Sequence, residues 1–200
     1  MGVSSRRATK PSATRLTVDD WTSAALRAIA RGGLAAVAVE PLAAGLGATK
    51  GSFYWHFVNR DALIEAALKR WEKDHTDAVI ALVETEAEPL ARLQLLIGTV
   101  IQYTASPQAD SIELAMLATA DHPHVAPMLA RVTERRVAYT AGLFEALGLA
   151  PDEAARRALF AVSTYLGHAQ LARAAPQVVP GSAGELRAYV DRIVELLTAV

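Results

Sequence analysis

Apolar residues recur along this chain with the three- or four-residue spacing of α-helices and almost nowhere with the alternation of strands. Alanine is abundant, β-branched runs are short, and the hairpin dipeptides Asn-Gly and Asp-Gly do not occur. The first helix is expected to follow the N-cap residue Thr17 and to end at Gly32-Gly33. Its apolar stripe consists of Trp21, Ala25, Ala28 and Ile29.

Prolines and capping residues divide the rest of the chain into further segments of helical length. A short helix is predicted from near Pro41 to about Gly45, and after a turn Thr49 caps a helix of about two turns. Asn59 caps a long helix that runs from Arg60 to about Thr85. Later helices are predicted over 89–105, 109–121, 123–147, 151–175 and 183–200. The chain is therefore expected to be all-α, with nine helices and no internal repeat.

Composition excludes several classes of protein. Apolar residues make up 52% and charged residues 20%, so the chain can bury a core and is not disordered. Cysteine is absent, which excludes disulfide scaffolds, Cys-based zinc sites, iron–sulfur clusters and thiol catalysis. The longest stretch without charge, 93–109, carries three glutamines and a proline and is predicted to be a buried helix, not a membrane span. Residues 1–17 do not resemble a secretory signal, and we expect a soluble, cytoplasmic protein.

Charge is distributed unevenly along the chain. Residues 1–70 hold ten Lys and Arg against five Asp and Glu, whereas residues 71–200 hold ten against sixteen. A basic first third suggests a polyanionic partner, although chance surface charge explains the asymmetry about equally well. Residues 1–16 place four basic residues among Ser, Thr and Pro, and we interpret them as a flexible basic arm.

The segment 42–54 has the requirements of a helix-turn-helix. Ala43 is the small residue needed where two helices cross, and Gly47, four positions later, tolerates the positive φ of the turn. Thr49 then begins a second helix whose N-terminal amides suit a phosphate. The apolar side chains that would face a third helix are Leu42, Leu46 and Phe53. The Ala-x-x-x-Gly spacing alone is weak evidence, because many pairs of helices share it.

The residues on either side of the turn, and those just after the second helix, make the assignment specific. The motif reads Leu42-Ala43, Gly47-Ala48-Thr49, Gly51-Ser52-Phe53-Tyr54, His56-Phe57, Arg60 and Leu63. This pattern, over about residues 15–65, resembles the N-terminal domain of the TetR family of transcriptional regulators. Arg60 stands where that family usually has Lys, and Pro41 where it often has a charged residue. Beyond residue 70 the chain is only compatible with the family.

The resemblance implies a DNA-reading surface on the second helix of the motif. Lys50 would reach a base edge or a phosphate, and Phe53 and Phe57 are expected in the core. The arm is either a minor-groove contact or a solubilising tail, and the residues leave both open. The residues assigned to DNA are Thr49, Lys50, Gly51, Ser52, Tyr54, Trp55, His56 and Arg60.

One short recognition helix reads only a few base pairs, so specific binding requires a homodimer on two half-sites. Two apolar stripes near the C-terminus are candidate interfaces, and TetR-like proteins dimerise through their last two helices. The assigned interface residues are Leu159, Val162, Leu166, Gly167, Leu186, Val190, Ile193 and Leu197. The alternative is that both stripes close the core of the monomer.

Polar groups on apolar helix faces indicate a binding cavity. His75 lies on the apolar face of the fourth helix, and the resemblance implies a ligand whose binding swings this helix. Arg136 hints at an anionic ligand, unless Arg135 points inward instead. The candidate ligand-binding residues are Trp71, His75, Tyr103, Met116, Arg136, Tyr139, Tyr165 and His168. Each of them taken alone is more often an ordinary core residue.

These observations predict a basic arm (1–16), a three-helix helix-turn-helix DNA-binding domain (17–62) and a ligand-binding and dimerisation bundle of about six helices (63–200). The expected function is a ligand-responsive DNA-binding regulator, a repressor that binds an inverted repeat and is released by a small molecule. No cofactor, membrane association or enzymatic activity is expected. No metal site is expected either, because Glu72-x-x-His75 is only half of a di-iron carboxylate motif. The segment His122-Pro123-His124 is more typical of a solvated turn between helices than of a metal site. The alternative is an all-α small-molecule-binding protein or enzyme without sequence-specific DNA binding.

Overall fold

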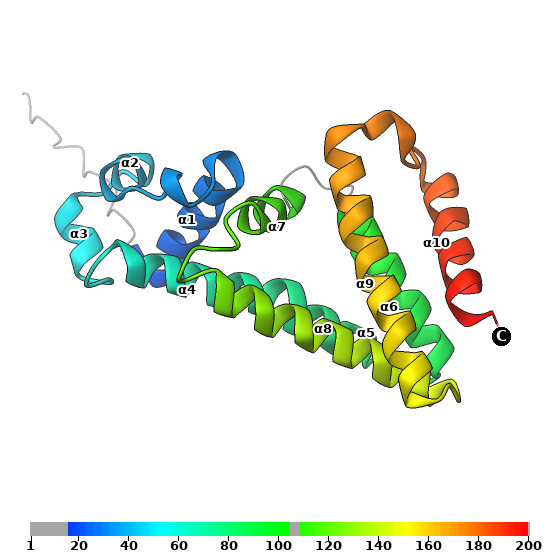
Figure 1. Cartoon of the computed structure of the whole chain (residues 1–200). Helices are drawn as coiled ribbons and strands as arrows, with labels where there is room; N and C mark the ends of the chain where they lie inside the picture. Colours follow the sequence, from blue (N-terminus) through cyan, green and yellow to red (C-terminus); the bar gives the residue numbers. More distant parts are fainter. Residues whose placement is uncertain (1–15, 105–108, 200) are drawn as a thin grey trace, which may run out of the picture.

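Three N-terminal helices form a small head, and a long helical connection joins this head to a C-terminal bundle (Figure 1). The computed structural model describes residues 16–104 and 109–199, a region that is helical and contains no strand. The predicted basic arm therefore lies outside the described residues. The helices are α1 (Val18–Gly32), α2 (Val39–Gly45), α3 (Lys50–Tyr54), α4 (Arg60–Glu72), α5 (Ala78–Val83), α6 (Pro89–Thr104), α7 (Ala109–Leu117), α8 (Ala126–Ala146), α9 (Pro151–Ala174) and α10 (Ala183–Thr198).

Local hydrogen bonds set the ends of α1 as the sequence predicts. The Thr17 hydroxyl accepts a bond from the Asp20 amide at 3.2 Å, and the Asp20 carboxylate accepts one from the Thr17 amide at 2.8 Å. The bond from the Thr17 amide lowers the pKa of Asp20. Gly33 ends the helix with a φ of 66°. The predicted stripe of Trp21, Ala25, Ala28 and Ile29 is buried.

The turn between α2 and α3 also follows the sequence. Gly47 has a φ of 64°, and the amide of Ala48 closes the turn onto the carbonyl of Ala43 at 2.8 Å. Thr49 caps α3 by accepting a bond from the Ser52 amide. Two predicted boundaries are wrong: α2 begins two residues before Pro41, because extended Ala38 already accepts the first helical bond, and α3 spans five residues, less than the predicted two turns.

The long connection is continuous from Arg60 to Val83, close to the predicted extent, and with α4 and α5 joined in this way the described chain has nine helices. Its middle, Lys73–Asp77, is a π-helical turn that the sequence pattern does not indicate. Helix α8 lies beside the connection (Figure 1) and is tied to it by ion pairs. Arg131 pairs with Glu72 at 2.5 Å, and Arg135 pairs with Asp77.

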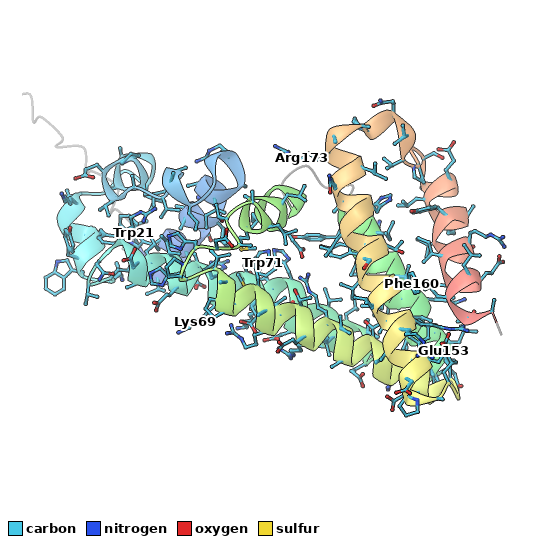
Figure 2. The ribbon with its side chains drawn as sticks, in the orientation of Figure 1. Trp21, Lys69, Trp71, Glu153, Phe160 and Arg173 are labelled. Atoms are coloured by element: carbon cyan, nitrogen blue, oxygen red, sulfur yellow. The ribbon has the colours of Figure 1, made fainter. Side chains whose placement is uncertain are left out.

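Two apolar cores fill the molecule. The first lies under the head and continues along α4 into α7 and the first half of α8, where Trp71, Met116 and Val132 belong to it. Figure 2 shows Trp21 inside the head and Trp71 farther along α4. The second core lies between α5, α6, α8, α9 and α10 and includes Phe144 and Ile193. Helix α7 packs against α1 as well as against α6 and α9, so it belongs to both halves of the molecule.

Among the described helices, none is long and apolar enough to cross a membrane.

Replacing Gly47 with Ala is expected to destabilise the protein by about 1 kcal/mol, because a side chain disfavours the left-handed backbone even though no atom lies within 4 Å of the new Cβ. Gly142 is the matched control, since it lies on the exposed side of α8 with open space around it. Gly142→Ala should instead stabilise the helix by roughly 0.5–1 kcal/mol. Urea unfolding followed by tryptophan fluorescence measures the change in unfolding free energy for both variants. Changes of the same sign would contradict the assignment of a left-handed backbone to Gly47 alone.

Candidate functional site

Helix α3 lies at the end of the head that is remote from the bundle (Figure 1). Beyond its capped N-terminus it exposes Lys50, Gly51 and Tyr54. Trp55 and Val58, just after the helix, are 82% and 83% exposed, which is unusual for large apolar side chains. Trp55 was predicted for this surface, but Val58 was missed, because the motif carries no signal at that position.

Phe53 and Phe57 are buried, as predicted, and they hold α3 in place. Phe53 packs edge-on against Trp21 of α1 with a centroid separation of 5.4 Å, and it stacks with Phe57 at 5.6 Å. The side chains on the other face of α3 are therefore presented outward on a fixed platform. His56, between the two faces, is half-buried.

Lys50 bonds to Glu40 of α2 at 2.6 Å. This hydrogen bond raises the pKa of Lys50 and lowers the pKa of Glu40. Both side chains are more than half exposed, and exposed ion pairs are weak and screened by salt. Lys50 can therefore exchange Glu40 for another anion at little cost.

Arg60 is placed differently from the expectation of a phosphate contact. Its Nε donates to the carbonyl of Val37 and its Nη2 to the carbonyl of Leu34, each at 2.6 Å. The guanidinium therefore fastens the loop between α1 and α2 to the start of α4. The sequence could not indicate this role, because the two carbonyls lie more than twenty residues away along the chain.

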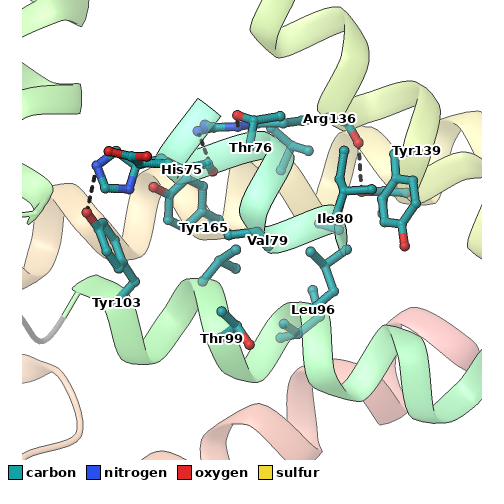
Figure 3. Close-up of a pocket in the computed structure, with 16 residues that line it drawn as sticks. His75, Thr76, Val79, Ile80, Leu96, Thr99, Tyr103, Arg136, Tyr139 and Tyr165 are labelled. Carbon is teal, nitrogen blue, oxygen red and sulfur yellow. Dashed lines mark hydrogen bonds between the residues drawn. The ribbon is translucent and has the colours of Figure 1, made fainter. Parts of the chain in front are cut away.

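A cavity of about 140 Å³ opens between α5, α6, α8 and α9 (Figure 3). Five of the eight side chains predicted for a ligand site line it, namely His75, Tyr103, Arg136, Tyr139 and Tyr165. The rest of its wall is largely apolar and was not predicted: Val79, Ile80, Leu96, Ile97, Val100, Ala161 and Val162. These residues look like any other apolar helix positions in the sequence.

The other three residues predicted for the ligand site do not line this cavity. Trp71 and Met116 are fully buried in the first core, on the far side of the cavity wall. His168 is buried against Tyr189 of α10, with a ring separation of 5.3 Å, and burial lowers its pKa. All three do lie inward, but helical periodicity does not indicate which interior space an inward side chain meets.

The two charged side chains that line the cavity, Asp74 and Arg136, are each paired with an opposite charge, Asp74 with Arg70 at 3.3 Å and Arg136 with Glu113. Arg136 donates from Nη1 to Glu113 of α7 at 2.6 Å and from Nε to the Thr76 hydroxyl at 3.2 Å. Tyr165 of α9 donates to the second carboxylate oxygen of Glu113 at 2.5 Å. The Arg136 and Glu113 side chains are only 17% and 8% exposed. Arg135 points outward to Asp77, so Arg136 is the inward arginine of the two.

At the end of the cavity nearest α7, the Tyr103 hydroxyl and the His75 Nε2 share a hydrogen bond of 2.9 Å (Figure 3). Burial lowers the pKa of His75, which keeps the imidazole neutral at pH 7. His75 and Thr76 both belong to the π-helical turn, so this turn forms part of the cavity wall. At the other end Tyr139 donates to Glu84 at 2.7 Å, and burial with this bond raises its pKa.

The predicted dimer residues divide into two groups. Leu186, Val190, Ile193 and Leu197 pack onto the second core, where α10 lies against α6, and Val162 lines the cavity. These five side chains make contacts within the monomer, as the alternative explanation of the stripes predicts. On α9, Leu159 and Gly167 are exposed and Leu166 is half-buried. The large apolar side chains exposed on α9 and α10 are the predicted Leu159 and, in addition, Phe160, Leu171 and Leu196.

The two candidate metal motifs are occupied by other contacts. Glu72 is engaged with Arg131, and His124 lies against Glu65 at 3.1 Å and Asp61 at 3.8 Å. Within the described part of the chain, no group of three or more His, Cys, Asp or Glu could hold a metal ion.

Comparison with known proteins supports the head and the overall fold. Residues 22–67 match the family model of bacterial regulatory proteins, tetR family. No curated protein matches the chain. A transcriptional regulator from Rhodococcus sp. Rha1 is 20% identical, with a TM-score of 0.75 and coverage of 91% of this chain and 96% of that one.

Two further similar structures were solved with ligands. The transcriptional regulator FadR from Bacillus subtilis, in complex with stearoyl-CoA, is 15% identical, with a TM-score of 0.71 and coverage of 92% of this chain and 98% of that one. A putative transcriptional regulator from Saccharomonospora viridis, in complex with choline, is 18% identical, with a TM-score of 0.71 and coverage of 89% and 95%. At these identities the likeness establishes the fold.

Replacing Glu113 with Gln is expected to destabilise the protein by about 3 kcal/mol, because the buried Arg136 loses its compensating charge. The double variant Glu113→Leu/Arg136→Met removes both charges, and its free energy of unfolding should fall much less than that of Glu113→Gln. Asp77→Asn, which breaks the exposed pair with Arg135, is the control and should change stability by less than about 0.5 kcal/mol. Urea unfolding compares the three, and equal losses for Glu113→Gln and Asp77→Asn would show that the pair is not effectively buried.

Proposed function

Because residues 22–67 carry the N-terminal domain of the TetR family and the described chain has the fold of its regulators, we propose that this protein is a ligand-responsive, DNA-binding transcriptional regulator. It acts as a repressor that binds an inverted-repeat operator as a homodimer and leaves it when a small molecule occupies the cavity. Residues 17–62 bind DNA, and residues 63–200 bind the ligand and form the dimer.

The observation that carries this proposal is the surface of α3. A capped helix with exposed residues at its start, the cation Lys50 and the exposed rings of Tyr54 and Trp55 suits insertion into a major groove. Lys50 and Trp55 read bases, while Thr49, Gly51, Ser52, Tyr54 and His56 contact the backbone. Arg60 supports this surface from behind through its bonds to the α1–α2 loop.

Dimerisation uses the exposed face of α9 together with the outer side of α10. Phe160 is 68% exposed and, with Leu196, borders a shallow groove between these helices. Gly167 is exposed farther along α9, with no atom within 4 Å of where its Cβ would lie, so a partner helix can approach closely there. A second copy that covers this face by two-fold symmetry would bring two α3 helices onto the same side of DNA.

Ligand occupancy can reach the head by two physical connections. The π-helical turn contributes His75 and Thr76 to the cavity and continues directly into α4, whose residues Leu63 to Trp71 are part of the head core. Glu113 of α7 accepts a hydrogen bond from Arg136, and Ile112 and Met116 of the same helix belong to the first core, under the head, where α7 packs against α1. A ligand that displaces the cavity wall would therefore shift the head and change the spacing of the two α3 helices.

The decisive experiment is selection of bound DNA from a random duplex pool by the purified protein. Enrichment of an inverted repeat would support a dimeric DNA reader and give its half-site spacing. No enrichment at low salt, with the protein folded, would contradict the proposal and favour an all-α small-molecule-binding protein or enzyme.

On the selected operator, Lys50→Ala is expected to weaken binding about tenfold or more, because a side chain that contacts a base edge is lost. Lys69→Ala is the matched control, since Lys69 is exposed on α4 (Figure 2) and its replacement removes the same charge away from α3. Fluorescence anisotropy of labelled operator measures both affinities. Equal effects of the two substitutions would assign Lys50 to general electrostatic attraction only.

Phe160→Glu is expected to shift the protein from dimer to monomer, because it places a charge in the centre of the apolar face of α9. Val18→Glu, a similar exchange of an exposed apolar residue in the head, should leave the dimer unchanged. Light scattering coupled to gel filtration gives the mass of each variant. A wild-type monomer, or a Phe160→Glu dimer, would contradict this interface.

A further inference from the structure

The two charged side chains that line the cavity each have a partner of opposite charge, which restricts what the cavity can hold: Arg136 pairs with Glu113, and Asp74 pairs with Arg70. Arg136 is bonded to Glu113, Thr76 and the carbonyl of His75, and it lies over the rings of Trp71 and Tyr165 at 5.2 and 5.8 Å. An anionic ligand would compete with Glu113 for the guanidinium, and it would be repelled by that buried carboxylate. A cationic ligand would be repelled by Arg136, which already lies over the Tyr165 ring, one of the aromatic faces that would attract a cation.

The remaining surface of the cavity favours an apolar molecule of limited size. The apolar lining comes from three helices, with Val79 and Ile80 of α5, Leu96 and Val100 of α6, and Val162 of α9. The volume of about 140 Å³ is close to that of apolar protein cavities of roughly 150 Å³ that bind benzene. A ligand that fills it without moving the helices is therefore about one ring in size.

One end of the cavity can bind a single polar group. Here the neutral imidazole of His75 and the Tyr103 hydroxyl meet at 2.9 Å (Figure 3). Imidazole and phenol together can both donate and accept hydrogen bonds, so a ligand hydroxyl or carbonyl can join them without bringing a charge. Thr99 also lines the cavity, near its floor (Figure 3).

We propose that this cavity binds a compact, uncharged and mainly apolar molecule, about the size of one ring, with one hydroxyl or carbonyl group directed at His75 and Tyr103. The inference rests on the proposed function in that it names the chemical class of the effector. It differs from the sequence-based hint of an anionic ligand, because Glu113 already compensates Arg136. It also separates this chain from the two similar regulators, whose structures hold stearoyl-CoA and choline.

The test is isothermal titration calorimetry of the full chain, without DNA, against four probes. 4-Ethylphenol should bind, and ethylbenzene, which lacks the hydroxyl, should bind about fivefold more weakly. The anion 4-ethylbenzoate and the cation choline should bind at least about tenfold more weakly than 4-ethylphenol. Tighter or equal binding of either charged probe, or binding of none of the four, would overturn the proposal. Equal binding of ethylbenzene and 4-ethylphenol would overturn the assignment of the polar group.

Three variants locate the site. Val79→Phe fills the cavity and should abolish binding of 4-ethylphenol, whereas Leu82→Phe, on the exposed side of the same helix, should not change it. His75→Leu should remove the preference for 4-ethylphenol over ethylbenzene. Glu113→Gln leaves Arg136 uncompensated and should raise the affinity for 4-ethylbenzoate relative to 4-ethylphenol about tenfold or more. Unchanged 4-ethylphenol binding by a folded Val79→Phe variant would place the ligand elsewhere.

The calorimetric result is independent of the DNA experiment. If the random duplex pool gives no operator but 4-ethylphenol binds better than the charged probes, the ligand class stands and the regulatory function fails. If an operator is found and the charged probes bind best, the function stands and the ligand class fails. With both in hand, 4-ethylphenol should release the operator, and His75→Leu should bind the same operator but require more probe for release.

Discussion

The buried ion pair between Arg136 and Glu113 is the interaction on which the arrangement of this molecule depends. It brings α7, α8, α9 and the π-helical turn to one point, since Tyr165 and Thr76 complete its hydrogen bonds. Such a pair adds little stability over a well-packed apolar replacement, but removal of either partner alone is costly. Its contribution is therefore to geometry: α7 is held where Glu113 bonds to two residues of the cavity wall, Arg136 and Tyr165, while the same helix packs against α1 of the head.

That geometry makes the cavity and the head parts of one connected structure. Trp71 belongs to the head core, yet its ring lies 5.2 Å from the Arg136 guanidinium and 5.8 Å from the His75 ring. The π-helical turn stands between α4 and α5, and π turns inside α-helices are frequent at functional sites because they hold one extra residue in the helical register. The elements between the cavity and α3 are therefore tightly packed, and tightly packed elements transmit a small displacement to their neighbours.

The same distribution of contacts determines which surfaces stay exposed. The apolar stripe of α10 packs in the interior of the bundle, so the large apolar side chains that stay exposed there lie mainly on α9, where Phe160 is the most exposed. In the head, Phe53 and Phe57 pack in the core, whereas Tyr54, Trp55 and Val58 are exposed to solvent. Exposed groups of this size at both ends of an otherwise well-buried molecule are typical of contact surfaces.

The sequence by itself determined whatever depends on neighbours along the chain. Caps at Thr17, Thr49 and Asn59, the left-handed turn at Gly47 and the inward face that carries His75 all arise from bonds or periodicities within a few residues. The helix-turn-helix was therefore predictable except for the start of α2 and the length of α3. Only the tertiary structure decided which partner an inward or long side chain meets: Arg60 bonds to carbonyls of the α1–α2 loop, Glu113 compensates Arg136, the α10 stripe faces α6, and Val162 faces the cavity. These contacts join residues far apart in the chain, and periodicity fixes the direction of a side chain but not what lies opposite it.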